Sequence, residues 1–215
     1  MHTILVWSGP VIYISMALAA LYGVFCVILL WRKVGQKRFG NPAAAGEFLD
    51  EVRGCLEEKD FDGVAELCDS PAYWAKATPQ MILVAIAHKE RGLAKLQQLL
   101  GEKFERDILA DIQYRHSWIG TISKTAPMLG LLGTVSGMIL AFEKIATASA
   151  EGGLDPGSLA QEISFALFTT AIGLVIAIPL TLLGAWVQVQ ISKMTDAVQD
   201  HLGEFLHDLE KAMTS

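Results

Sequence analysis

Three long stretches of the chain contain no Asp, Glu, Lys or Arg: residues 3–31, 125–142 and 163–187. They are 29, 18 and 25 residues long, and a helix needs about 20 predominantly apolar residues to cross a bilayer. The first stretch lacks a charged start and exceeds the apolar core of a secretory signal, so we expect it to be retained. The pattern therefore predicts an all-α integral membrane protein with three transmembrane helices.

Apolar side chains also recur at helical spacing outside these stretches. Before the second stretch, they lie three or four residues apart at Leu93, Leu96, Leu100, Phe104, Ile108 and Ile112. After the third stretch, the same spacing joins Ile191, Met194, Val198, Leu202, Phe205 and Leu209. We expect the second and third transmembrane helices to extend beyond the membrane into a helical domain. There they pack against one another or, as the alternative, against a partner's helix.

Charges beside the apolar stretches predict the orientation in the membrane. Four basic residues, Arg32, Lys33, Lys37 and Arg38, follow the first stretch, whereas residues 143–162 carry one base and four acids. Short basic flanks stay in the cytoplasm, so the helical domain is expected to be cytoplasmic. The expected segments are an outer N-terminus at 1–10, a first transmembrane helix at 11–31, a cytoplasmic helical segment at 32–120, a second transmembrane helix at 121–147, an outer loop at 148–160, a third transmembrane helix at 161–189 and a cytoplasmic C-terminal helix at 190–215.

Composition narrows the classes of function. The chain is 52% hydrophobic and 19% charged with a net charge of −6, and this acidic balance argues against nucleic acid as a partner. Its 3 cysteines have no metal-ligand spacing and leave an odd thiol, so neither a metal site nor a disulfide framework is expected. We find no nucleophilic side chain that the sequence pattern combines with a histidine and a carboxylate, as a catalytic triad would require. We therefore predict that the chain is not an enzyme and uses no cofactor.

Small residues form a stripe on each of the second and third predicted helices. The stripes consist of Gly130, Gly133 and Gly137 in the second helix and Ala166, Gly173 and Ala177 in the third. Because small residues let helix backbones approach closely in lipid, these two helices are predicted to pack tightly. Each stripe also carries a hydroxyl, at Thr134 and at Thr170. Spacing alone leaves open whether these hydroxyls bond their own backbone carbonyls or have a polar function.

Both stripes lie in sequences that resemble a known family. Residues 126–139, APMLGLLGTVSGMI, resemble the second-span signature of the MotA/TolQ/ExbB proton-channel family. Residues 163–179, ISFALFTTAIGLVIAIP, resemble its third-span signature. The resemblance covers about residues 117–185 and is closest to the ExbB/TolQ branch.

The resemblance implies a stator-type proton-channel subunit of the bacterial inner membrane, with its N-terminus in the periplasm and its C-terminus in the cytoplasm. Such proteins form pentamers around a dimer of single-span partners of the ExbD/TolR type. The complex couples the proton motive force to mechanical work on the cell envelope. This work serves TonB-dependent uptake (biopolymer transport) or a Tol-Pal system, with a TonB-like or TolA-like protein as a further partner.

The resemblance also assigns roles to individual residues. Thr134 and Thr170 match the family's polar pathway positions, where their hydroxyls would face the central partner helices. The neighbouring Thr169 is expected to point about 100° away around the helix and to matter less.

One position departs from the family pattern. Relatives often carry Glu in the third span, within Ile-x-Glu-Ala-Leu, where this chain has Phe165. A carboxylate in mid-membrane must then come from the partner. Glu162, one turn earlier, is a further candidate for the outer entrance of the ion pathway, and an ordinary interfacial Glu at a helix start is the alternative. A sodium-driven stator and a structural scaffold without an ion pathway are the alternatives to a proton channel.

Overall fold

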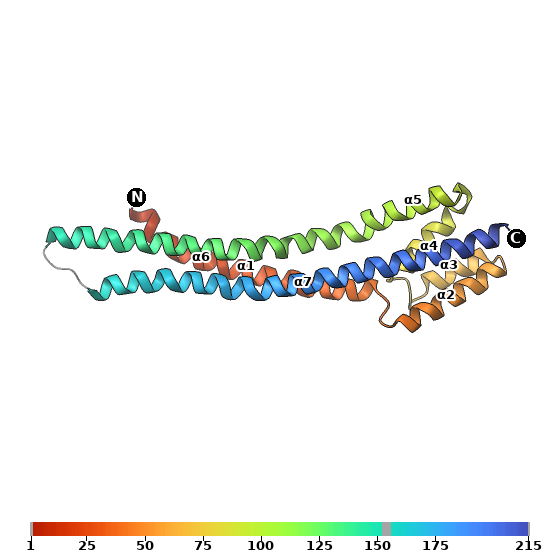
Figure 1. Cartoon of the computed structure of the whole chain (residues 1–215), viewed down its shortest axis with the longest axis horizontal. Helices are drawn as coiled ribbons and strands as arrows, with labels where there is room; N and C mark the ends of the chain where they lie inside the picture. The colour runs from red at the N-terminus through yellow and green to blue at the C-terminus, as the bar shows by residue number, and fades with distance from the viewer. Residues whose placement is uncertain (1, 152–155, 215) are drawn as a thin grey trace. The chain divides into compact units, whose positions relative to one another are not determined.

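A computed structural model describes residues 2–151 and 156–214 of the chain. Every regular element in these residues is helical, and three helices are long and apolar enough to cross a membrane. The predicted fold class is therefore confirmed. The elements, drawn in Figure 1, are α1 (His2–Lys37), α2 (Pro42–Glu57), α3 (Phe61–Asp69), α4 (Ala77–Ala87), the 3₁₀ turn η1 (Lys89–Arg91), α5 (Leu93–Lys103), the π-helical turn η2 (Phe104–Leu109), α6 (Ala110–Glu151) and α7 (Pro156–Thr214).

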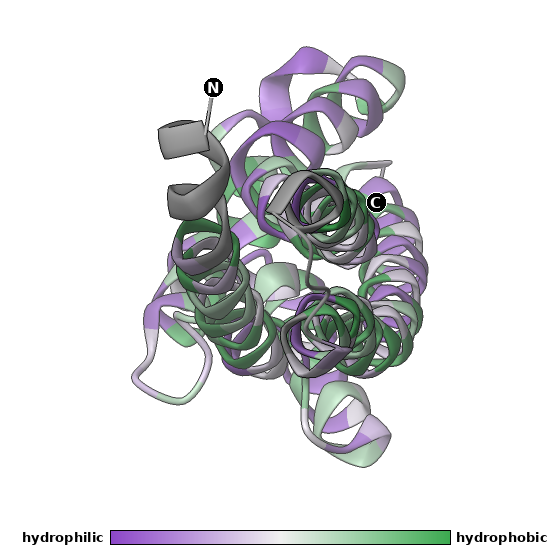
Figure 2. Ribbon diagram, turned by 90° about the vertical axis from the view of Figure 1, so that its left-hand side faces the viewer, coloured by the Kyte–Doolittle hydropathy of each residue, from purple (hydrophilic) through white to green (hydrophobic). Residues whose placement is uncertain are grey.

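The three long helices continue beyond the apolar stretches of the sequence. Helix α1 already begins at His2, so most of the expected outer N-terminus is helical. Helix α6 continues to Glu151 and α7 begins at Pro156, so the connection expected over 148–160 is helical wherever the structure describes it. Figure 2 looks along these helices and colours them largely as hydrophobic.

The chain divides into two compact units that are described separately. The first unit comprises residues 1–28 and 116–186, which hold nearly all of the charge-free sequence. The second unit comprises residues 29–115 and 187–215, with the short helices α2 to α5 and the C-terminal part of α7.

The C-terminal part of α7 contributes a stripe of buried side chains to the second unit. It consists of the six residues singled out by spacing, Ile191, Met194, Val198, Leu202, Phe205 and Leu209, all of them buried. Arg53 of α2 donates hydrogen bonds to Asp208 at 2.8 Å and to Glu204 at 2.5 Å. Thr78 of α4 lies 3.2 Å from the ring of His201. The tail of α7 therefore packs against α2 and α4.

The π-helical turn η2 explains how the other stripe stays on one face. Five buried side chains follow at intervals of four residues, at Leu96, Leu100, Phe104, Ile108 and Ile112. In a regular α-helix this spacing would rotate the stripe by about 160° from first to last. Because a π turn takes in one extra residue, η2 reduces that rotation to about 60°. The turn therefore keeps the apolar side chains directed into the core.

Asp60 starts α3 as its N-cap residue. Its carboxylate accepts a hydrogen bond from the backbone N–H of Gly63 at 2.9 Å. A methyl group on Gly63 would collide with this carboxylate, so the aspartate and the glycine are matched to each other. This cap helps the chain to begin a new helix after a connection of only three residues, 58–60.

We expect Asp60→Ala to lower the free energy of unfolding by about 1 kcal/mol, the usual cost of losing an N-cap acceptor. Asp60→Ser keeps an acceptor oxygen and should stay near the wild-type value. Thermal unfolding of the full chain in detergent measures both variants. An equal loss in the alanine and serine variants would contradict the capping role.

Candidate functional site

Helices α6 and α7 approach each other most closely at their glycines. A Cβ added to Gly130 would lie 2.9 Å from the backbone of Thr170, and one added to Gly137 would lie 2.8 Å from the Cβ of Ala166. On α7, a Cβ on Gly173 would lie 2.7 Å from the carbonyl oxygen of Ala126. Real Cβ atoms essentially never come that close, so these positions accept only glycine without a shift of a helix.

A cluster of hydroxyl groups lies where these glycines bring the helices together. The Thr134 hydroxyl on α6 contacts the Thr170 hydroxyl on α7 directly. Thr134 Oγ1 also lies 3.3 Å from the carbonyl oxygen of Gly130 and 3.2 Å from that of Ala166. Thr170 Oγ1 lies 3.1 Å from the same Gly130 oxygen. The two threonines therefore bridge the helices, although Thr134 can also bond its own helix at Gly130.

Thr169 belongs to the same cluster, and the expectation that it points away is wrong. Its side chain is fully buried, and its hydroxyl donates to the carbonyl oxygens of Ala166 at 2.8 Å and Gly130 at 3.2 Å. It fills the space that the absent side chain of Gly133 leaves on α6. The helix interface is wide enough to take in both neighbours because they lie three and four residues after Ala166. That spacing is the signal by which the sequence could have indicated Thr169.

Counting lone pairs shows that the cluster has more than one hydrogen-bonding arrangement. Three hydroxyls, those of Thr134, Thr169 and Thr170, lie within 3.1–3.3 Å of the Gly130 oxygen, but a carbonyl oxygen has only two lone pairs. Thr170 can donate to Gly130 while accepting from Thr134. Alternatively, Thr134 donates to a carbonyl while accepting from Thr170. The direction of the pair can therefore reverse by rotation of hydroxyl hydrogens alone.

Glu162 lies near the start of α7 and forms an ion pair across to α6. Lys144 Nζ donates to its carboxylate at 2.6 Å, and the Glu162 side chain is only 22% exposed. The carboxylate is therefore paired with a cation. A Cβ added to Gly137 would lie 3.1 Å from the carbonyl oxygen of Glu162. Glu162 therefore belongs to the same helix interface as Gly137.

Phe165, which departs from the family pattern, lies in the N-terminal part of α7, on the side that faces α1. Its ring packs edge-on against Tyr13 of α1, with ring centroids 5.4 Å apart. The contact between α1 and α7 is thus aromatic here.

Because residues 125–142 and 163–187 contain no acidic or basic side chain, the hydroxyls of the cluster lie within charge-free sequence.

These features agree with comparisons with known proteins. The model of the MotA/TolQ/ExbB proton channel family matches residues 75–200, more than half of the chain. The chain belongs to this family, and its relatives' names agree with the ExbB branch.

Among individual relatives, the biopolymer transport protein exbB1 of Vibrio cholerae is 41% identical over 162 residues, which is 66% of this chain and 64% of that protein. A putative ExbB-like 2 protein of Helicobacter pylori is 40% identical over 65 residues, 30% of this chain and 41% of that protein. The chain thus matches less than two thirds of the length of either relative. A solved structure of C. jejuni MotAB has a TM-score of 0.54 at 16% identity, covers 92% of this chain and 74% of that chain, and supports the fold.

Proposed function

We propose that the chain is the ring-forming subunit of a proton-driven complex in the bacterial inner membrane. In this complex, protons pass along the Thr134–Thr170 hydroxyl pair to a carboxylate on a single-span partner of the ExbD/TolR type. The observation that carries the proposal is the reversible hydroxyl pair, placed in sequence without any charged group. The mechanical work would act on the cell envelope through a TonB-like or TolA-like protein.

The hydroxyl pair suits a proton because either oxygen can donate or accept. A partner carboxylate alternates between an ionised form, which only accepts hydrogen bonds, and a protonated form, which also donates one. The Thr134–Thr170 pair can meet both forms by reversing its direction. Both side chains are partly exposed in the isolated chain, which leaves them open to a further helix.

The proton motive force would supply the energy for the proposed motion. Moving one proton across the membrane yields about 2.3 kcal/mol per 100 mV. This energy would serve to shift the partner helices between neighbouring positions inside the ring. The closed ring would surround the partner helices, and five copies with a partner dimer are the stoichiometry that the family resemblance implies.

Large apolar side chains on both helices support assembly within lipid. On α6, Met128, Leu131 and Phe142 are 60–66% exposed, and on α7 Leu167 and Val175 are 65% and 70% exposed. In an isolated chain these side chains would meet water. Lipid tails and neighbouring copies of the chain are the surroundings that suit them.

Proton flux in liposomes tests the proposal. The chain should carry protons only when reconstituted with its single-span partner, because the chain alone offers no carboxylate in mid-membrane. We expect dye-detected acidification under an imposed potential, lost when the Asp or Glu within the span of the partner is changed to the amide. Flux that follows a sodium gradient would favour a sodium-driven stator. Full envelope function without any ion flux would favour the scaffold.

Thiol labelling tests the orientation. A cysteine introduced at Gly152, which lies outside the described residues, should react with an impermeant thiol reagent added from the periplasmic side. One introduced at Gly40, which has nothing within 4 Å of its added Cβ, should react only after the cells are opened. The comparison requires a background in which the three native cysteines are replaced by serine. The reverse labelling pattern would overturn the orientation predicted from charge.

A further inference from the structure

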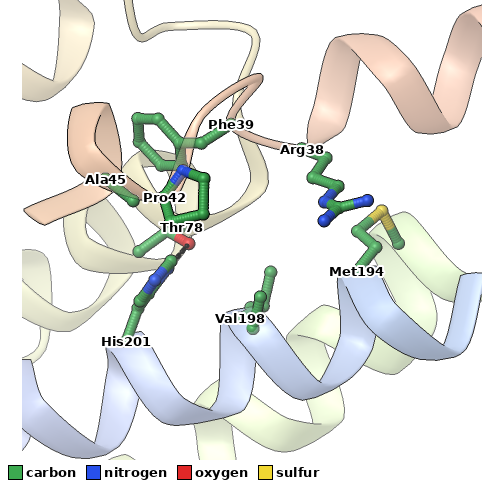
Figure 3. A pocket seen from close by; sticks show the side chains of 9 residues that line it. Arg38, Phe39, Pro42, Ala45, Thr78, Met194, Val198 and His201 are labelled. Atoms are coloured by element: carbon green, nitrogen blue, oxygen red, sulfur yellow. Dashed lines mark hydrogen bonds between the residues drawn. The ribbon is translucent and has the colours of Figure 1, made fainter. Parts of the chain in front are cut away.

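The second unit contains a cavity of about 110 Å³ that the proposed ion pathway does not use. Its walls come from four parts of the chain: the connection between α1 and α2, the first turn of α2, the first turn of α4 and the C-terminal part of α7. Figure 3 shows Arg38 on one side of it, Thr78 and His201 on the other, and Val198 rising from α7 between them. It thus joins segments that lie far apart in the sequence.

Arg38 provides a positive charge that is held in position. Its guanidinium donates to the side-chain oxygen of Gln190 at 3.1 Å, and its carbonyl oxygen accepts from Lys76 Nζ at 2.7 Å. A guanidinium has five N–H donors in a planar fork, so the bond to Gln190 leaves capacity for an anion. The fork matches the two oxygens of a carboxylate.

The opposite side of the cavity is polar but uncharged. Thr78 is only 2% exposed, and its hydroxyl lies 3.2 Å from Nδ1 of His201. Burial lowers the pKa of His201, although Glu204 and Asp200 on the same helix act in the other direction. The imidazole is therefore neutral near pH 7 and can donate or accept one further hydrogen bond.

The remaining walls are apolar and well packed. Phe39 packs against Phe48, with ring centroids 5.6 Å apart, and it meets the His201 ring edge-on at 6.1 Å. Pro42 and Val198 also line the cavity, and none of the described residues that line it is acidic. An apolar pocket with a few convergent polar groups is the usual form of a small-molecule site.

We propose that this cavity binds a small organic monocarboxylate with an apolar body, through its carboxylate on Arg38 and its body between Phe39, Pro42 and Val198. A single arginine fork suits one carboxylate, whereas the walls offer no second cation of the kind that a phosphate dianion would need. The size suits a short chain, since the cavity of about 110 Å³ is smaller than the apolar cavity of about 150 Å³ that holds benzene. The bound molecule would link α7 to the segment that follows α1.

Binding of 4,4,4-trifluorobutyrate, a short-chain monocarboxylate, to the full chain in nanodiscs, followed by ¹⁹F NMR, tests the proposal. We expect saturable binding that stabilises the protein against thermal unfolding. The uncharged 4,4,4-trifluorobutyramide should bind about tenfold or more weakly, because it cannot form the charge-assisted bond to Arg38. This comparison uses only the wild-type chain and therefore does not depend on the folding of any variant.

Three variants locate the site. Arg38→Gln should weaken binding of 4,4,4-trifluorobutyrate by about tenfold or more. Arg32→Gln removes a charge of the same basic cluster outside the cavity and should leave binding unchanged. Ala197→Leu, at a partly exposed position in the cavity wall, should block binding by filling the space. Equal binding by acid and amide, equal binding by Arg38→Gln and wild type, or a signal no larger than that of empty nanodiscs would overturn the proposal.

Discussion

Replacing both Thr134 and Thr170 by valine should reduce proton-driven work by about tenfold to hundredfold while the complex still assembles. Valine nearly keeps the shape of threonine but removes the two hydroxyls that contact each other across α6 and α7. A polar group left unpaired in a buried place costs about 1–3 kcal/mol. In the proposed pathway this cost would fall on the partner carboxylate, which would need the pair in both of its protonation states. Proton flux in liposomes and envelope function in cells measure the loss.

Two matched variants make this result specific. The Thr134→Ser and Thr170→Ser double variant keeps both hydroxyls and should retain most of the activity. Thr181→Val removes a hydroxyl from the same helix α7, but that hydroxyl bonds the carbonyl of Ala177 in its own helix at 2.8 Å, so little should change. Full activity in the double valine variant would show that the hydroxyls serve only the backbone.

Replacing Gly133 by leucine should disrupt the packing of α6 on α7 and, with it, assembly of the ring. An added Cβ would already lie 2.6 Å from Cβ and 2.9 Å from Cγ2 of Thr169, which is itself fully buried. Leucine adds three more carbons at a place where neither helix backbone can yield without moving the other. Overpacking of this kind costs about 1–3 kcal/mol and sometimes more.

Native mass spectrometry of the purified chain measures the result. The wild type should give a closed ring, expected to be a pentamer, whereas Gly133→Leu should give smaller or heterogeneous species with a similar helix content. Gly120→Leu is the matched control on the same helix, since a Cβ there has nothing within 4 Å. Rings of equal yield and stability from both variants would show that the close approach at Gly133 is not needed.

The sequence was sufficient to predict the helical class and the three apolar helices, because charge-free runs of this length leave few other structures in lipid. It was also sufficient to select glycines at which the structure brings two helices together. The position of Thr169 was predicted wrongly because the interface was defined by one direction around the helix. Close packing at Gly133 buries Thr169 and also brings its neighbour Thr170 into contact with α6. The width of a helix–helix contact depends on how closely the two backbones approach each other. The spacing of residues along one helix does not determine that distance.

Two other features could not be predicted from spacing. The cavity beside Arg38 combines residues from the connection after α1, from α2, from α4 and from α7. Only the tertiary fold brings these segments together. The π-helical turn at Phe104–Leu109 could not be predicted either, because a run of apolar residues four apart is also compatible with a regular helix that curves around its partner. The choice between the two depends on which neighbours are packed around it.

That turn also affects which changes of chain length the helix can tolerate. Removing one residue at most places in an α-helix rotates everything beyond it by about 100°, which would carry Ile112 and the residues after it off the buried face. Within Phe104–Leu109 the helix already holds one residue more than an α-helical turn needs. A one-residue deletion there would convert the turn to ordinary α-helix and leave the side chains before and after it in their present register. Natural length variation among homologous chains should therefore concentrate in this turn.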